Sequence, residues 1–223
     1  MQTTAPHATP VIHVGRRIVL GMVGLGAAGL VLGKNLNPLS LLNAAASGVG
    51  TSSGLGFRIY TVNGVPAYDP TTWRMQVDGM VAQPMNLTFD ALQGLPQSQQ
   101  VGIFHCVTGW SVPNLTWGGV KMNDFLVHVK PQPSASYMTL YSGDGVYTDS
   151  ISLRQASQQD VMLAHSMNGA ALPLEQGQPV RLIIPEMYGY KNIKWVNRIQ
   201  FTDHPVSGYW EQNGYPVDAY IKK

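Results

Sequence analysis

The single cysteine of this 223-residue chain, Cys106, is the residue best suited to chemistry. It follows a short apolar run, residues 101–105, as expected where a strand gives way to a loop, and functional groups are often mounted there. Three interpretations are open. A lone cysteine is commonly a small buried apolar residue, but it can also be a nucleophile with a base in reach or a ligand to a soft metal. His105 precedes it directly, so in a strand its side chain would point to the opposite face.

Other chemistries near Cys106 are disfavoured by the residue pattern. One cysteine excludes an intramolecular disulfide and any zinc site built on paired cysteines. The stretch Gly109-Trp110-Ser111-Val112-Pro113 nearly matches the Gly-x-Ser-x-Gly turn of serine esterases, but the final glycine is missing. Serine hydrolysis is therefore a poor interpretation of Ser111.

A second dense region, residues 172–203, gathers basic side chains in a chain with only 12% charged residues. Arg181, Lys191 and Lys194 lie close together in sequence, and the backbone amides around residues 189–193 could form an anion-binding nest. Guanidinium and ammonium groups suit a phosphate or pterin oxygens. A solvated basic loop is the alternative.

The two regions together resemble one family. The motifs Cys106-Val-Thr-Gly-Trp-Ser, Trp117-Gly-Gly-Val and Asn123-Asp-Phe-Leu are similar to the cofactor loop of the sulfite-oxidase-fold molybdopterin oxidoreductases. Gly177-Gln-Pro-Val-Arg-Leu, followed by Tyr188-Gly-Tyr-Lys and Lys194-Trp, is similar to the pterin-binding half of that family. The resemblance covers about residues 57–215. It is nearest to the small exported catalytic subunits of the bacterial methionine-sulfoxide-reductase type.

The resemblance implies the cofactor and its site. The cofactor would be Mo-molybdopterin, with Cys106 as the catalytic thiolate ligand of the metal. Gln176 stands where the family often has His or Asn, and an amide can still donate and accept hydrogen bonds. The implied cofactor-binding residues are Arg58, Tyr60, Thr61, Cys106, Ser142, Gln176, Arg181, Lys191, Asn192, Ile193 and Lys194.

The resemblance also implies a reaction class. We expect oxygen-atom transfer, with reduction of small-molecule or protein-bound S-oxides or N-oxides as the leading reaction. Sulfite oxidation on the same cofactor is the alternative, and a metal-free binding module on the same fold is a third. A separate electron carrier would be needed: a membrane haem protein, a quinone or a cytochrome.

Charge distribution argues against nucleic acid as a partner. Residues 47–223 contain 11 of the 14 basic residues and all 12 acidic ones, so this part has no basic excess. A nucleic-acid-binding domain needs a basic face.

The first 46 residues are typical of an export signal or an N-terminal membrane anchor. Arg16-Arg17 precede the uncharged apolar run 18–33, a pattern of twin-arginine export. Within it, residues 24–29 match Gly-x-Gly-x-x-Gly, but no acidic residue follows before Asp69, so dinucleotide binding is rejected. We expect the mature protein on the extracytoplasmic or periplasmic side.

One α+β domain, rich in short strands, must position these groups. We expect residues 47–56 to form a Gly/Ser-rich linker. The resemblance implies that residues 57–223 form the molybdopterin-binding domain, without the C-terminal immunoglobulin-like dimerisation domain of sulfite oxidases. Strands are expected at 73–77, 101–105, 137–141, 180–184 and 195–201. Helices are expected at 88–95, capped by Thr88, and at 123–129, capped by Asn123. Residues 161–167 fit either a helix or a strand.

Overall fold

The computed structural model of the protein describes residues 49–50 and 56–222, which belong to one compact unit, residues 45–223. The expected export signal or anchor, with its paired arginines, and most of the expected linker lie outside the described residues. In the part of the chain that the structure describes, no helix has both the length and the apolar character to cross a bilayer.

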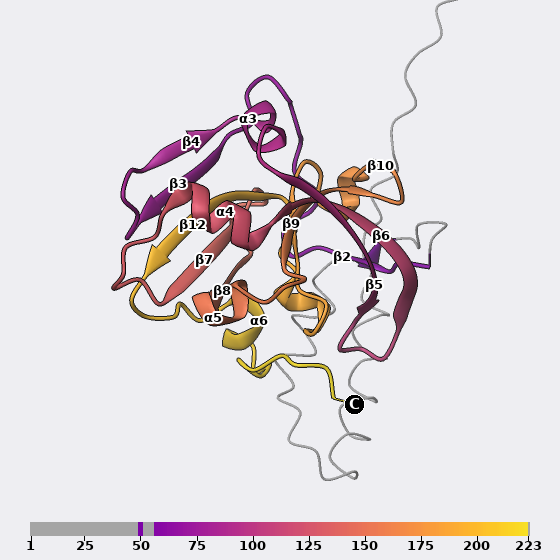
Figure 1. Cartoon of the computed structure of the whole chain (residues 1–223). Coiled ribbons are helices and arrows are strands. Elements are labelled where there is room, and N and C mark those ends of the chain that lie inside the picture. The colour runs from indigo at the N-terminus through magenta and orange to yellow at the C-terminus, as the bar shows by residue number, and fades with distance from the viewer. Residues whose placement is uncertain (1–48, 51–55, 223) are drawn as a thin grey trace, which may run out of the picture. The chain divides into compact units, whose positions relative to one another are not determined.

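A first five-stranded sheet gathers strands from both ends of the domain (Figure 1). Its order is β4 (Met85–Leu87), β3 (Met75–Gly79), β12 (Val196–Thr202), β7 (Tyr137–Ser142) and β8 (Thr148–Ser152). β12 runs parallel to β3, and the other neighbours are antiparallel. The sheet therefore joins residues that lie far apart in the sequence.

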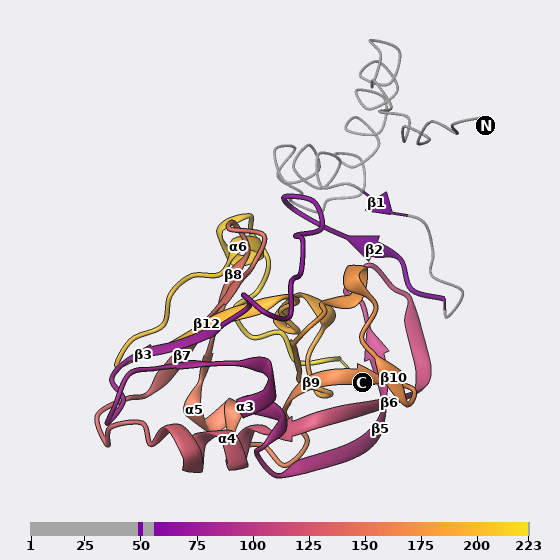
Figure 2. The ribbon, with the colours of Figure 1, turned by 90° about the horizontal axis from the view of Figure 1, so that it is seen from above.

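A second sheet carries the cysteine (Figure 2). Its order is β10 (Ala170–Ala171), β9 (Met162–Met167), β6 (Ser111–Lys121) and β5 (Gln97–His105), and β11 (Arg181–Ile183) pairs with β9. β5 and β6 form an antiparallel hairpin whose connection contains Cys106. β1 (Val49–Gly50) and β2 (Ile59–Tyr60) form a separate two-stranded pair.

The helical elements are short and connect the strands. They are α3 (Phe89–Gln93), α4 (Met122–Val129), α5 (Leu153–Ala156), α6 (Tyr209–Gln212) and the 3-10 turns η1 (Leu174–Gln176) and η2 (Gly189–Lys191). Thr88 caps α3 as expected, because its hydroxyl accepts a hydrogen bond from the Ala91 amide at 3.1 Å. The α+β, strand-rich fold class is confirmed.

The two sheets pack around two apolar clusters. The larger cluster contains Phe125 of α4 together with residues of both sheets, and the smaller contains Trp117 and apolar residues near the Cys106 hairpin. β9 faces both clusters, since Leu163 belongs to the larger one while Met162 and Ala164 belong to the smaller. Burial on both faces removes the polar alternation of a strand, which explains why residues 161–167 could not be assigned from sequence.

One local expectation was wrong, and one strand was not predicted. α4 begins at Met122, because β6 runs into it without a loop, and the Asn123 side chain donates to the Ser157 carbonyl at 3.3 Å instead of capping the helix. Residues 111–121 form the longest strand, although it contains Pro113 and no strand was expected there. This strand also rules out an esterase-type turn at Ser111, which would need a helix after the serine.

Candidate molybdopterin site

Cys106 sits at the start of a tight turn between β5 and β6. Its amide donates to the Trp110 carbonyl at 2.9 Å, and its carbonyl accepts from the Gly109 amide at 3.1 Å. Gly109 has a φ of 91°, a left-handed conformation that favours glycine. The turn therefore fixes the backbone on both sides of the thiol.

The environment of Cys106 separates the three interpretations of a lone cysteine. The residue is half-buried and belongs to neither apolar cluster, which argues against a simple core role. Within residues 49–50 and 56–222, its Sγ makes one polar contact, with the hydroxyl of Thr108 at 3.2 Å. The neighbouring His105 ring instead contacts the Ser111 hydroxyl at 2.7 Å, so it does not serve as a base for the thiol. The geometry favours a ligand over an activated nucleophile.

Arg181 is a fully buried cation beside the cysteine hairpin. Its guanidinium lies 5.4 Å from the ring centre of Phe104 and 5.2 Å from that of Trp117, both residues of that hairpin. Its side chain is 2% exposed, and no carboxylate in the described ranges 49–50 and 56–222 forms an ion pair with it. Burial lowers the pKa of Arg181 to about 9, so it remains charged at neutral pH. A buried charge of this kind normally has an anionic partner.

One side-chain nitrogen of Arg181 and one of Gln176 lack a hydrogen-bond acceptor among the described residues. The guanidinium donates to the carbonyl and the side-chain oxygen of Gln176, at 3.0 and 3.1 Å. Arg181 Nε and Gln176 Nε2 are buried and have no partner among the described residues. Because buried donors are rarely left unpaired, these two atoms indicate room for acceptor atoms of a ligand.

Lys194 adds a second cation to this cluster. Its ammonium donates to the carbonyls of Tyr60 and Glu175, at 2.9 and 3.0 Å. Burial, reinforced by the Arg181 charge, lowers the pKa of Lys194 to about 7. Gly177, with a φ of 114°, is pressed between the two cations, since a Cβ there would lie 3.1 Å from the Cβ atoms of both Arg181 and Lys194. The sequence-predicted residues Gln176, Arg181 and Lys194 therefore converge.

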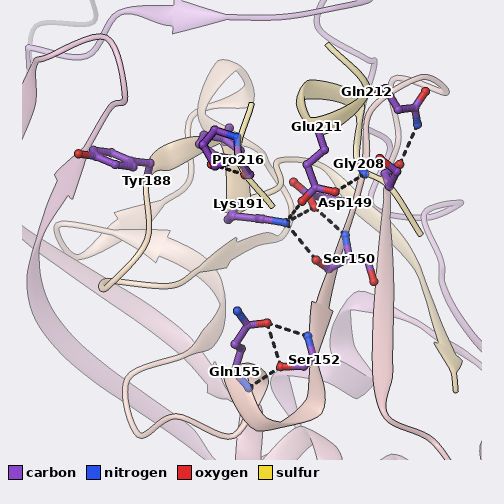
Figure 3. A network of polar contacts seen from close by, with 12 residues as sticks. Asp149, Ser150, Ser152, Gln155, Tyr188, Lys191, Gly208, Glu211, Gln212 and Pro216 are labelled. Carbon is purple, nitrogen blue, oxygen red and sulfur yellow. Dashed lines mark hydrogen bonds and ion pairs between the residues drawn. The ribbon is translucent and has the colours of Figure 1, made fainter. Parts of the chain in front are cut away.

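Lys191 has a different environment, shown in Figure 3. Its ammonium donates to Asp149 Oδ1 at 2.6 Å, to the Ser150 carbonyl at 3.2 Å and to Glu211 Oε1. An ammonium has three hydrogens, and these contacts use all of them. The expectation that the Lys191 side chain grips the cofactor therefore needs revision, because two carboxylates already neutralise it.

Asn192 and Ile193 are also held by the protein itself. The Asn192 side chain accepts from the Ile184 amide at 2.7 Å and donates to the carbonyls of Met187 and Tyr188, while Ile193 belongs to the larger apolar cluster. The amides of Lys191 and Asn192 donate within η2, at 3.0 and 3.1 Å. These two amides are therefore already hydrogen-bonded and are not available to the anion-binding nest expected there.

The four remaining predicted residues differ in burial and in contacts. Ser142 is buried at the end of β7 and pairs with Val196 of β12, just after Lys194. Tyr60 stacks near Trp110 with ring centres 6.4 Å apart. Arg58 is exposed and Thr61 is half-buried.

Tyr215 is a further candidate residue that the sequence did not predict. Burial raises the pKa of Tyr215, and electrostatic interaction with Cys106 and Tyr60 raises it further. Its phenol therefore stays protonated at neutral pH and can donate. No motif around Tyr215 predicts an interaction with Cys106, because the two residues lie far apart in the sequence.

Comparisons with known proteins agree with this geometry. Residues 62–210 match the family model of the oxidoreductase molybdopterin binding domain. The chain belongs to this family.

The chain is also similar to individual members. It is 36% identical over 160 residues to the uncharacterized oxidoreductase YuiH of Bacillus subtilis, covering 71% of this chain and 80% of YuiH. It is 36% identical to a putative protein-methionine-sulfoxide reductase subunit, YedZ1, of Azospira oryzae, covering 66% of this chain and 55% of that protein. The solved structure of the sulfane dehydrogenase SoxCD from Paracoccus pantotrophus matches with a TM-score of 0.65 and 24% identity, covering 71% of this chain and 45% of that one. This last likeness shows the fold.

Family membership makes the chain an oxidoreductase with Mo-molybdopterin as its cofactor. The residues present fit such a group, because a pterin carries oxygen acceptors and a phosphate. Arg181 and Lys194 supply positive charge, and Arg181 Nε and Gln176 Nε2 supply free buried donors.

Proposed function

We propose that this chain is an exported molybdenum oxidoreductase that reduces S-oxides or N-oxides by oxygen-atom transfer. One observation carries the proposal: a half-buried cysteine, fixed in a turn, belongs to a hairpin that packs against the buried cation Arg181, which neighbours Lys194. In the described part of the chain this pair of cations has unsatisfied donors beside it and forms no ion pair with a carboxylate. A relative's name supports the substrate class, since YedZ1 is described as a putative protein-methionine-sulfoxide reductase subunit.

The protein's residues have separate tasks in this proposal. Cys106 is the thiolate ligand of the metal, and a thiolate is a strong donor to soft or borderline metals. Arg181, Gln176 and Lys194 hold the oxygen-rich parts of the cofactor, with support from Ser142, Tyr60, Thr61 and Arg58. Bound molybdenum supplies the two-electron redox chemistry.

Tyr215 is proposed to assist the substrate. Reduction of an S-oxide consumes two electrons and two protons and yields a thioether and water. In this proposal the protonated Tyr215 phenol donates a hydrogen bond to the oxygen that leaves the substrate. A small-molecule oxide or an oxidised methionine on a protein would present the same group.

Export and electron supply complete the proposal. Arg16-Arg17 before an apolar run favour twin-arginine export, which moves folded proteins and therefore suits a cofactor inserted in the cytoplasm. In this proposal a separate carrier delivers the electrons: a membrane haem protein, a quinone or a cytochrome.

The decisive experiment replaces Cys106 by Ser in chain produced with molybdate. We expect one molybdenum and one pterin to remain, because Arg181, Gln176 and Lys194 are unchanged. The sulfur-to-metal charge-transfer absorption and the turnover of an S-oxide should both disappear.

Thr108→Val is the matched control, because it removes the contact to Sγ but leaves the thiol in place. Its spectrum and turnover should persist. An unchanged spectrum and unchanged turnover in Cys106→Ser would remove Cys106 from the metal. Oxidation of sulfite with an artificial acceptor, without oxide reduction, would replace the proposed reaction by sulfite oxidation.

A further inference from the structure

The C-terminal segment 208–216 carries Tyr215 but has little means of holding itself in place. Its only regular element is α6, a single turn at Tyr209–Gln212, and an isolated helix of this length does not persist alone. Something in the rest of the domain must therefore keep the segment against the Cys106 hairpin.

Glu211 supplies the strongest link between this segment and the domain. Its side chain is only 4% exposed and forms an ion pair with Lys191 of η2. The same carboxylate accepts from the Gly208 amide at 2.8 Å and so caps α6. The single side chain thus both stabilises the turn and docks it (Figure 3).

Lys191 connects Glu211 to the first sheet through Asp149 of β8. Asp149 is fully buried and lies 2.6 Å from the ammonium. Burial, opposed by Lys191 and reinforced by Glu211, raises the pKa of Asp149 to about 7. Two buried carboxylates on one ammonium would not be expected for fold stability alone, since such groups are costly to desolvate.

The contacts that run from Glu211 to Tyr215 are short. The Gly214 amide donates to the Glu211 carbonyl at 3.0 Å, and the Tyr215 amide donates to the Trp210 carbonyl at 2.9 Å. These two bonds tie the Tyr215 backbone to the turn that Glu211 anchors.

A neighbour of Lys191 supports the same segment from the other side. The Tyr190 hydroxyl donates to the Pro216 carbonyl at 2.7 Å, and its ring packs edge-on against Tyr215 with centres 5.3 Å apart. The Tyr147 hydroxyl in turn donates to the Tyr190 carbonyl at 2.5 Å. η2 is therefore the docking platform of segment 208–216.

We propose that Lys191, Asp149 and Glu211 are positioning residues, whose network docks segment 208–216 and its Tyr215 on η2. Gly189 of η2 lies directly against the Phe104 ring of the Cys106 hairpin, so the docked segment lies next to that hairpin. The inference rests on the proposed function only for the effect on turnover. The docking itself is a property of the protein without cofactor and can be measured there.

The first test measures exposure of the only cysteine in the full chain purified without molybdenum. Glu211→Gln keeps the size of the side chain but removes its charge. We expect Cys106 to react with iodoacetamide about three- to tenfold faster, because undocking follows the loss of a charge-assisted contact. Tyr190→Phe, which removes the bond to Pro216 without changing any charge, should act in the same direction.

Asp78→Asn is the matched control, because it breaks a carboxylate–cation pair of β3 and β12, with Arg198, that does not contact segment 208–216. Its Cys106 reactivity should equal that of the unmodified chain. If Glu211→Gln and Tyr190→Phe lower the melting temperature but leave Cys106 reactivity equal to that of Asp78→Asn, the network only stabilises the fold and the proposal is overturned.

The second test is a double-mutant cycle on the loaded enzyme with an S-oxide substrate. Glu211→Gln should lower kcat, but it should have no further effect in a Tyr215→Phe background, because both changes remove the same contribution. Equal effects in both backgrounds would contradict positioning through Tyr215. A chain that reduces no oxide would refute the proposed function, while the iodoacetamide test would still decide the docking.

Discussion

Arg181 and Lys191 are both fully buried cations of the same short stretch of chain, and their environments are opposite. Lys191 contacts two carboxylates and one carbonyl, which use all its hydrogens. Arg181 contacts only neutral carbonyl oxygens and aromatic rings, and one of its donors has no partner in the described part of the chain. The lysine is neutralised by the protein, whereas the arginine needs an anion from outside. Of two basic residues with the same sequence signal, only one has capacity for a ligand.

The largest effect should come from removing the neutralised cation. Lys191→Met leaves Asp149 and Glu211 buried without a counter-charge, so the cofactor-free chain should lose about 3–5 kcal/mol of unfolding free energy. Denaturant unfolding measures this loss. Arg198→Met is the comparison, because its pair with Asp78 is partly exposed and should be worth only about 1 kcal/mol or less. Equal losses in the two variants would show that the Lys191 network stabilises the fold no more than a partly exposed ion pair does.

Removing the other cation should weaken the cofactor instead of the fold. Arg181→Met replaces an unpaired buried charge by an apolar side chain of similar length, so the cofactor-free chain should lose less stability than Lys191→Met does. Molybdenum retention after dilution should fall about ten- to a hundredfold, the value of one charge-assisted contact. Full retention in this variant would place Arg181 outside the site and end the contrast between the two residues.

A smaller effect should appear in the pH dependence of the cofactor-free chain. The folded pKa of Lys194 is about 7 and its ordinary value is 10.5, so the unfolded chain binds more protons between these values. Stability should therefore rise with pH from 7 to 9, by at most about 1.4 kcal/mol per pH unit, and should be lost as pH falls toward 7.

Denaturant unfolding at several pH values measures this slope. Lys194→Met should abolish it, and bound cofactor should flatten it because an anion stabilises the charged ammonium. A slope that persists in Lys194→Met would show that another group titrates there.

Local sequence patterns predicted where some of the strands and helices begin or end. The apolar run before Cys106 gave the end of β5, and Thr88 gave the start of α3. The start of α4 was missed, because β6 continues directly into the helix and leaves no capping position. Residues 161–167 stayed ambiguous, since both faces of β9 are covered by apolar clusters that only the packed fold creates.

The sequence by itself determined the residue types of the site. The motifs around Cys106, Gln176, Arg181 and Lys194 resemble those of the family, and this resemblance, a property of the chain, implies that these residues hold the cofactor. The tertiary structure decided which groups are free to act. Asp149 and Glu211 lie 42 and 20 residues from Lys191 and reach it only through folding, and Tyr215 packs against Tyr190 of η2 only in the folded chain. The ion pairs of Lys191 and the placement of Tyr215 depend on residues far apart in the sequence, so no local pattern around either residue could predict them.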